Sequence, residues 1–264
     1  MGAASHSAAR IVLGLECGRA EEAALEAALA LAAGMGSELA ALFVEDERLL
    51  RLAALPFGQE IGRTSALLRT LGREQIEHAF QAEAGRLRRM LADAAGPLAL
   101  KWTLDVARGD LMAVSIERLG PEDLLVVGRG WRADFARSRP GGGKTPFRLL
   151  AMRPVAVLLT ESEQAWRALD AAFAIARRTA GELTVLIQEA GQQEFRAQRE
   201  RARERLAGAA ARYLHVPEKG PRAIAQVVRS HGAAALVWPG LAPRQRAALA
   251  EMLEELACPV VLLF

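Results

Sequence analysis

A glycine-rich segment follows a short apolar stretch in the middle of this 264-residue chain. Residues 124–127, Leu-Leu-Val-Val, are too few and too β-branched for a helix, so they predict a buried strand. Gly128 and Gly130 end this pattern, and an arginine-rich polar stretch leads to three more glycines at 141–143. Residues 145–146, Thr-Pro, are typical of a helix N-cap and first helical position. A strand, a glycine loop and a helix in this order present backbone N–H groups to a phosphate.

In its spacing, this segment resembles the nucleotide loop of the universal stress proteins. That loop consists of glycine, two residues, glycine, nine residues, glycine and then serine or threonine, and a helix and a Pro-Val strand follow it. Gly128 and Gly141 are 13 positions apart, which is the family's span, and Pro154 follows after another 13. Two positions depart from the family. The middle glycine is Gly130, one place early, and Gly142 stands where the family has a hydroxyl residue.

The resemblance implies an adenine-nucleotide site between the glycine loop and the end of the first strand. In the family the first strand ends in an aspartate that lies beside the nucleotide, and Glu16 takes that place here. An equally good interpretation of Glu16 is an acid that accepts hydrogen bonds from the following turn. Because the hydroxyl is missing and Trp131 occupies the expected glycine position, we expect ATP to bind weakly or not at all. The residues that the resemblance assigns to the nucleotide are Glu16, Val127, Gly128, Gly130, Gly141 and Gly142.

A second motif overlaps this segment, because residues 143–145, Gly-Lys-Thr, match the end of a P-loop, G-x-x-x-x-G-K-[ST]. The leading glycine of that motif would fall on Ser138, and the preceding strand ends about ten residues earlier. A flexible loop with a capped helix behind it is therefore the better interpretation. Elsewhere the sequence assembles no nucleophile, base and orienting group, and its four histidines lack ligand spacing. We expect a non-enzymatic protein without a metal, and a nucleotide-dependent phosphotransferase using Lys144 and Thr145 is an alternative.

The composition is that of a soluble globular protein, with 52% hydrophobic and 25% charged residues. A formal charge of +3 is too small to predict a nucleic-acid partner. The two cysteines form no metal or disulfide pattern, and the N-terminus lacks the apolar core of a signal peptide. No apolar run is long enough to span a bilayer. We therefore expect a cytoplasmic protein that does not contact a membrane.

Apolar runs alternate with helical patterns along the whole chain, which predicts an α/β fold. ALEAALALAAGMGSELAAL, from Ala24, recurs in pattern as ALDAAFAIARRTAGELTVL, from Ala168. We predict two tandem doubly wound parallel-sheet domains of the Rossmann type, as in the family that the chain resembles. The first would span 1–153 and the second, shorter one 154–264. Residues 238–240, Trp-Pro-Gly, lead straight to a helix in the second domain, so we expect no nucleotide loop there.

Two complete domains of this type need ten strands, and the sequence supplies nine. Residues 154–159 match both the last strand of the first repeat and the first strand of the second. Residues 160–163 form a capping box that starts the next helix at once, so we predict that 154–159 lies at the centre of the second sheet. The first sheet would then lack a fifth strand or take it from 259–264.

Residues 45–63 form an insert that is longer than an ordinary connection, before a predicted helix at 67–95. Its many leucines favour a lid packed on its own domain, and a partner-facing groove over 49–61 is the alternative. Because single domains of the family pair, we expect the two repeats to form an intramolecular pseudo-dimer, and a homodimer is possible. These features predict a cytoplasmic regulatory or binding protein of the universal stress type. A pure interaction module that has lost ligand binding is the alternative.

Overall fold

The computed structural model describes most of the chain, and the structural statements below concern those residues. They are 10–16, 21–55, 59–61, 68–70, 72–128, 150–188, 191–216, 220–240, 253, 255, 256 and 258–263. The first half contains β1 (Ile11–Leu15), α1 (Glu21–Met35), β2 (Leu39–Asp46), α2 (Glu47–Ala53), β3 (Gln59–Ile61), β4 (Leu68–Thr70), α3 (Arg73–Ala95), the 3-10 turn η1 (Gly96–Leu98), β5 (Trp102–Gly109), α4 (Leu111–Glu117) and β6 (Leu124–Val127). The second half contains β7 (Val155–Leu159), α5 (Glu163–Thr179), β8 (Leu183–Ile187), α6 (Gln192–Arg205), β9 (Ala211–His215), α7 (Pro221–Ser230), β10 (Ala235–Trp238) and β11 (Val260–Leu263).

Nine strands form one continuous sheet in the order β5-β2-β1-β6-β11-β10-β7-β8-β9. Every neighbouring pair is parallel except β6 and β11, which run antiparallel. Helices lie in each connection from β1 to β6 and from β7 to β10, as a parallel sheet requires. The predicted α/β, doubly wound fold is therefore confirmed, and the two predicted sheets are joined through β11. The predicted domain division at 153/154 stays a prediction, because β11 is hydrogen-bonded to strands from both sides of it.

The predicted position of β7 at the centre of the second sheet is confirmed. Val157 pairs with Val185 of β8 on one side and with Val237 of β10 on the other. For the first sheet the prediction was either no fifth strand or a fifth strand taken from 259–264, and the structure shows the latter. β11 occupies the fifth place beside β6, with Val261 opposite Val126.

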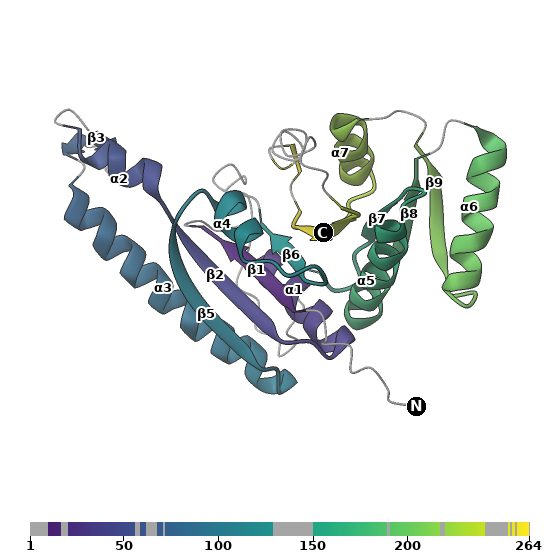
Figure 1. Cartoon of the computed structure of the whole chain (residues 1–264), viewed down its shortest axis with the longest axis horizontal. Coiled ribbons are helices and arrows are strands. Elements are labelled where there is room, and N and C mark those ends of the chain that lie inside the picture. The colour runs from purple at the N-terminus through teal and green to yellow at the C-terminus, as the bar shows by residue number, and fades with distance from the viewer. Residues whose placement is uncertain are drawn as a thin grey trace.

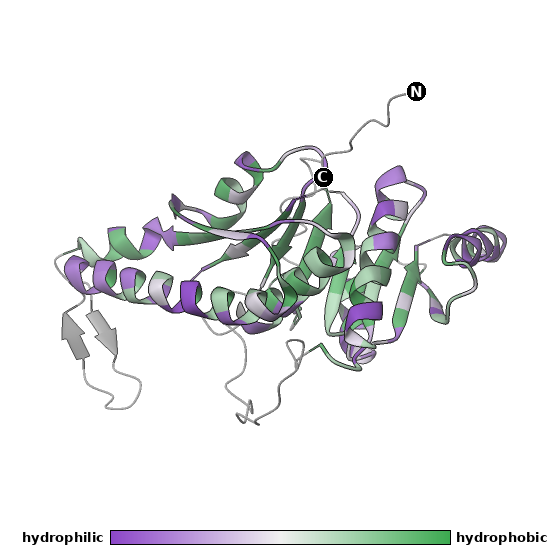
Figure 2. Ribbon diagram, turned by 90° about the horizontal axis from the view of Figure 1, so that it is seen from below, coloured by the Kyte–Doolittle hydropathy of each residue, from purple (hydrophilic) through white to green (hydrophobic). Residues whose placement is uncertain are grey.

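The helices cover both faces of the sheet and make a three-layer molecule (Figure 1). One apolar core lies between the sheet and α1, α3, α5 and α6, and it includes Leu13, Phe43 and Val185. The other lies under α4 and α7 and includes Val12 and Leu236. Figure 2 shows that the central strands are hydrophobic, while hydrophilic residues lie along the outer helices. No helix among the described residues is long and apolar enough to cross a membrane.

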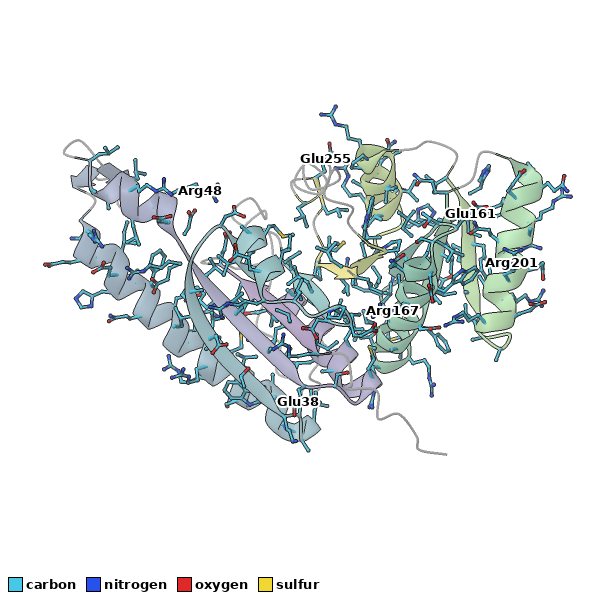
Figure 3. The ribbon with its side chains drawn as sticks, in the orientation of Figure 1. Glu38, Arg48, Glu161, Arg167, Arg201 and Glu255 are labelled. Atoms are coloured by element: carbon cyan, nitrogen blue, oxygen red, sulfur yellow. The ribbon has the colours of Figure 1, made fainter. Side chains whose placement is uncertain are left out.

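The two halves also meet through α1 and α5, which pack against each other. The contact is close because both helices present small residues. A Cβ added at Gly34 would lie 3.1 Å from the Cβ of Ala174. At the ends of this contact, Arg178 donates a hydrogen bond of 2.6 Å to the carbonyl of Ala33. Arg167, labelled in Figure 3, forms a 2.8 Å ion pair with Glu122 across the junction.

The insert after β2 begins with α2, which lies beside α3 at the end of the molecule away from the second half (Figure 1). Leu50 is buried, and Leu49 and Ala53 pack against the main core. Leu52 and Leu55 remain 45% and 41% exposed. The described part of the insert is therefore a lid with one packed side and one partly exposed apolar side.

The second part of the insert differs from the prediction. Residues 59–61 and 68–70 form a small antiparallel hairpin, where the sequence pattern predicted the start of a long helix at 67. The helix begins only at Arg73, because Gly72 has an extended backbone and serves as its N-cap. The side chain of Gln75 accepts a 3.3 Å hydrogen bond from the Gly72 N–H, which fixes this start.

Asp123 joins the beginnings of β1 and β6. Its carboxylate accepts hydrogen bonds from the backbone N–H and the guanidinium of Arg10 and from the N–H of Gly120. The Arg10 Nη2 to Asp123 Oδ2 distance is 2.7 Å, and the aspartate is nearly buried. Burial raises the pKa of Asp123, but the hydrogen bonds from Gly120 and Arg10 outweigh burial and hold the pKa below its ordinary value.

We expect Asp123→Asn to lower the free energy of unfolding by about 1–3 kcal/mol at neutral pH. A lowered carboxyl pKa contributes stability above the unfolded-state pKa, and this contribution is lost as the pH falls through the folded-state pKa. The difference between wild type and variant should therefore shrink in acid, which urea unfolding at several pH values measures. Asp93→Asn, at an exposed position on α3, is the control. An Asp123→Asn effect that is the same at every pH would contradict this account.

Candidate functional site

The carboxyl ends of β1 and β6 lie next to each other at one edge of the sheet. The last pair of their ladder joins Gly14 to Val127, so Gly128 follows β6 level with Leu15, and Glu16 leaves β1 one residue further on. The connection after β1 leads through α1 on one face, whereas α4 leads into β6 on the other face. This is a topological switch point, where doubly wound proteins bind their ligands.

Gly14 allows α4 to approach this edge closely. A Cβ added at Gly14 would lie 3.1 Å from Leu111 Cδ1, 3.2 Å from Ser115 Oγ and 3.3 Å from Val127 Cγ1. The close approach brings the beginning of α4 to the end of β1. The Leu111 N–H there donates a hydrogen bond to the Glu16 carboxylate.

Glu16 is half-buried and lies among other carboxylates. Burial raises the pKa of Glu16 above its ordinary value, and the negative charges of Asp46 and Asp110 raise it further. Arg48 and the hydrogen bond from Leu111 act in the opposite direction without cancelling the rise. Glu16 therefore accepts a proton more readily than an exposed glutamate does.

Asp46 and Asp110 are the N-caps of α2 and α4. The Asp46 Oδ1 accepts hydrogen bonds from the backbone N–H of Arg48 at 2.8 Å and from its Nε at 3.0 Å. The Asp110 Oδ1 accepts from the Ala113 N–H at 3.1 Å. Figure 3 labels Arg48, which extends from the beginning of α2.

We expect Glu16→Gln to stabilise the protein at neutral pH. A raised glutamate pKa contributes stability below the unfolded-state pKa, and that contribution is lost as the pH rises through the folded-state pKa. Glutamine has no charge to lose, so the variant should melt higher than wild type near pH 7, and the two should converge below about pH 4. Thermal unfolding across this range measures the effect. Equal melting temperatures at every pH would show that burial and the neighbouring carboxylates do not raise the pKa of Glu16 in the folded protein.

The structure describes three of the six predicted nucleotide residues. Glu16, Val127 and Gly128 lie together at the switch point, and the Val127 side chain is buried in the core under α4 and α7. Gly130, Gly141 and Gly142 lie outside the described residues, as does Trp131. The structure therefore leaves their assignment a prediction.

Three residues at this edge were missed in the sequence analysis, namely Asp46, Arg48 and Asp110. A signal for the two aspartates was available. Each directly precedes a helix after a strand, and the carboxyl ends of parallel strands meet at one edge of the sheet. Among the described residues, no group of three or more histidine, cysteine, aspartate or glutamate side chains is arranged to hold a metal ion.

The corresponding edge of the second half has different chemistry. The Thr160 Oγ1 lies 3.1 Å from the Ser162 Oγ, and Ser162 rather than Thr160 caps α5 by accepting from the Ala165 N–H. The helix therefore begins two residues later than the capping box predicted. Gly240, with φ 58°, turns the chain directly after β10.

No protein-family model matches the chain, and no curated protein sequence is significantly similar to it. Solved structures do match its fold. A universal stress protein from Archaeoglobus fulgidus DSM 4304 matches with a TM-score of 0.55 and 14% identity, over 96% of this chain and 95% of that chain. A putative universal stress protein from Pseudomonas aeruginosa UCBPP-PA14 matches with a TM-score of 0.45 and 14% identity, over 97% of this chain and 94% of that chain. A shorter universal stress protein from Archaeoglobus fulgidus, in complex with dAMP, covers 44% of this chain with a TM-score of 0.34 and 17% identity, over 99% of its own length.

The sheet order and the switch point define a doubly wound α/β protein. Its nearly full-length match to the Archaeoglobus fulgidus DSM 4304 protein shows that the fold is that of the universal stress proteins. The resemblance found in the sequence is thereby confirmed at the level of the fold.

Proposed function

We propose that this chain is a universal-stress-type regulatory or binding protein that holds an adenine nucleotide weakly, and only in its first half. The observation that carries the proposal is the placement of Glu16 and Gly128 at the switch point between β1 and β6. The glycine spacing of the following segment and the fold of the chain both support it. We further propose that the protein is non-enzymatic and cytoplasmic.

The described residues fit the nucleoside end of such a ligand better than its phosphates. Glu16 and Asp110 offer carboxylate oxygens, which accept hydrogen bonds from hydroxyl and amino groups. The same charges repel phosphate. The phosphates would therefore be held by residues 128–142, where the sequence supplies glycines and several arginines.

Calorimetric titration with ATP tests this function. We expect weak binding by wild type and tighter binding by Gly142→Ser, because the added hydroxyl restores the family's missing contact. One hydrogen bond to a charged group contributes about 1.5–3 kcal/mol, which is roughly tenfold or more in affinity. Trp131→Gly should also tighten binding by removing a steric obstacle.

The matched control is Gly220→Ser, which places the same hydroxyl in open space before α7 in the second half. Its affinity for ATP should equal that of wild type. Tight binding by the wild type would instead mean that the arginine-rich segment has replaced the family's contacts. Absence of binding by all four proteins would end the nucleotide proposal.

A protein partner is a second candidate function, supported by the exposed side of the insert. Leu52 and Leu55 are large apolar side chains with more than two-fifths of their surface in solvent. We propose that residues 49–61 contact a protein partner or a second copy of the chain, and that the two halves act as an intramolecular pseudo-dimer. Light scattering of wild type and of the double variant Leu52→Glu, Leu55→Glu tests the second copy. An unchanged molar mass would leave no support for homodimerisation through this surface.

A further inference from the structure

Three carboxylates share one face at the carboxyl edge of the first half. Glu16 follows β1, Asp46 ends β2, and Asp110 precedes α4. The register of β1 against β2 puts Glu16 and Asp46 on the face that carries α4. Asp46 pairs with Gly109, the residue directly before Asp110. The fold itself therefore brings the three groups together.

Two of these carboxylates are held in place by the helices that they cap. Asp46 accepts the Arg48 N–H, and Asp110 accepts the Ala113 N–H. Turning either side chain away would leave the first turn of a helix without its cap. Both negative charges therefore stay near Glu16.

Few positive charges oppose them within the described residues. From β2 and α2, Arg48 contacts Asp46, but its side chain is 70% exposed and its charge is screened. From α4, Glu16 receives only the Leu111 N–H. β6 contributes apolar side chains alone, and the 2.6 Å ion pair between Arg108 and Glu45 lies on the opposite face.

We infer that nucleotide binding at this edge takes up a proton at Glu16. The inference rests on the function proposed above. Even with its phosphates held away from the three carboxylates, a polyphosphate ligand adds negative charge to the same edge of the sheet and displaces water that screens the carboxylates. A proton from solvent on the Glu16 carboxylate removes one of these charges, and the neutral carboxyl group can still hydrogen-bond to the ligand. Burial and the charges of Asp46 and Asp110 already raise the pKa of Glu16 in this direction.

The test is calorimetric titration of wild type and Glu16→Gln with ATP, between about pH 8 and about pH 5.5, in two buffers with different heats of ionisation. The protons that ATP itself exchanges are common to both proteins, so the difference between them belongs to Glu16. We expect wild type to take up more protons per ATP than the variant. Its affinity should rise severalfold toward that of Glu16→Gln as the pH falls.

Two comparisons sharpen the result. Asp46→Asn keeps a helix N-cap while removing one charge, so it should reduce the proton uptake of the wild type. Adenosine lacks the phosphates, so its affinity should depend less on pH than that of ATP.

Equal proton uptake by wild type and Glu16→Gln would overturn the inference while leaving nucleotide binding intact. Binding by wild type but not by Glu16→Gln would also overturn it, because the ligand would then require the ionised carboxylate. If neither protein bound ATP at any pH, the proposed function would fail and the inference would fail with it.

Discussion

Val261→Asp is expected to unfold both halves of the chain together. Val261 is completely buried in β11, and it pairs with Val126 of the first half and with Val237 of the second. An uncompensated charge at such a site costs on the order of 3–5 kcal/mol. Domains are stable by only about 5–15 kcal/mol, so this is a large fraction of the total. Because β11 completes the sheet for both halves, the loss should not stay in one of them.

Val106→Asp provides the matched control for this prediction. Val106 lies on the edge strand β5 and is 46% exposed, so a charge there stays in water. Its cost should be about 1 kcal/mol or less. Urea unfolding combined with limited proteolysis measures both variants. If peptides from one half of Val261→Asp resisted protease while the other half was cut, the two halves would be independent and this account would be wrong.

Gly14→Leu is expected to give the second largest effect, because it separates α4 from the sheet. Even a Cβ at Gly14 would approach Leu111, Ser115 and Val127 within 3.1–3.3 Å. Overpacking of this kind typically costs about 1–3 kcal/mol, and a leucine has three further carbon atoms to place. Movement of α4 would also withdraw the Leu111 N–H from Glu16, so the candidate site would be damaged together with the fold.

The control for Gly14→Leu is Gly96→Leu, at a position where an added Cβ meets no atom within 4 Å. The midpoint of urea unfolding should fall clearly for Gly14→Leu and little for Gly96→Leu. Similar midpoints for the two variants would mean that the contact between α4 and β1 is not tight.

Most strands of the large sheet could be predicted from the sequence because they are short apolar runs bounded by glycine, proline or polar residues, whereas the edge strand β5 was recognised from its alternation of apolar and polar residues. The assignment of β7 also followed from local signals, since its connection leads at once into a helix. The structure shows that β11 joins the strands of the two halves into one sheet, but the sequence could offer its place beside β6 only as one of two outcomes. Nothing local to residues 260–263 distinguishes a strand with one neighbour from a strand with two.

The small hairpin was not predicted, because its two strands of three residues are too short to show an alternating pattern. The carboxylate cluster was missed for a different reason. Asp46 and Asp110 each have an ordinary explanation as helix caps, and only the pairing of β1 with β2 and of β2 with β5 brings both near Glu16. Glu16 itself was found through the family resemblance and not through its neighbours.

The most direct test of the central claim, that the first half alone binds an adenine nucleotide, is photoaffinity labelling of the intact protein with an azido derivative of ATP, followed by peptide mapping. The account predicts label in peptides that contain Glu16 or Gly128, and loss of that label when unmodified ATP is added in excess. Displaceable label in peptides around Thr160 or Gly240 would contradict it, because the nucleotide would then lie in the second half.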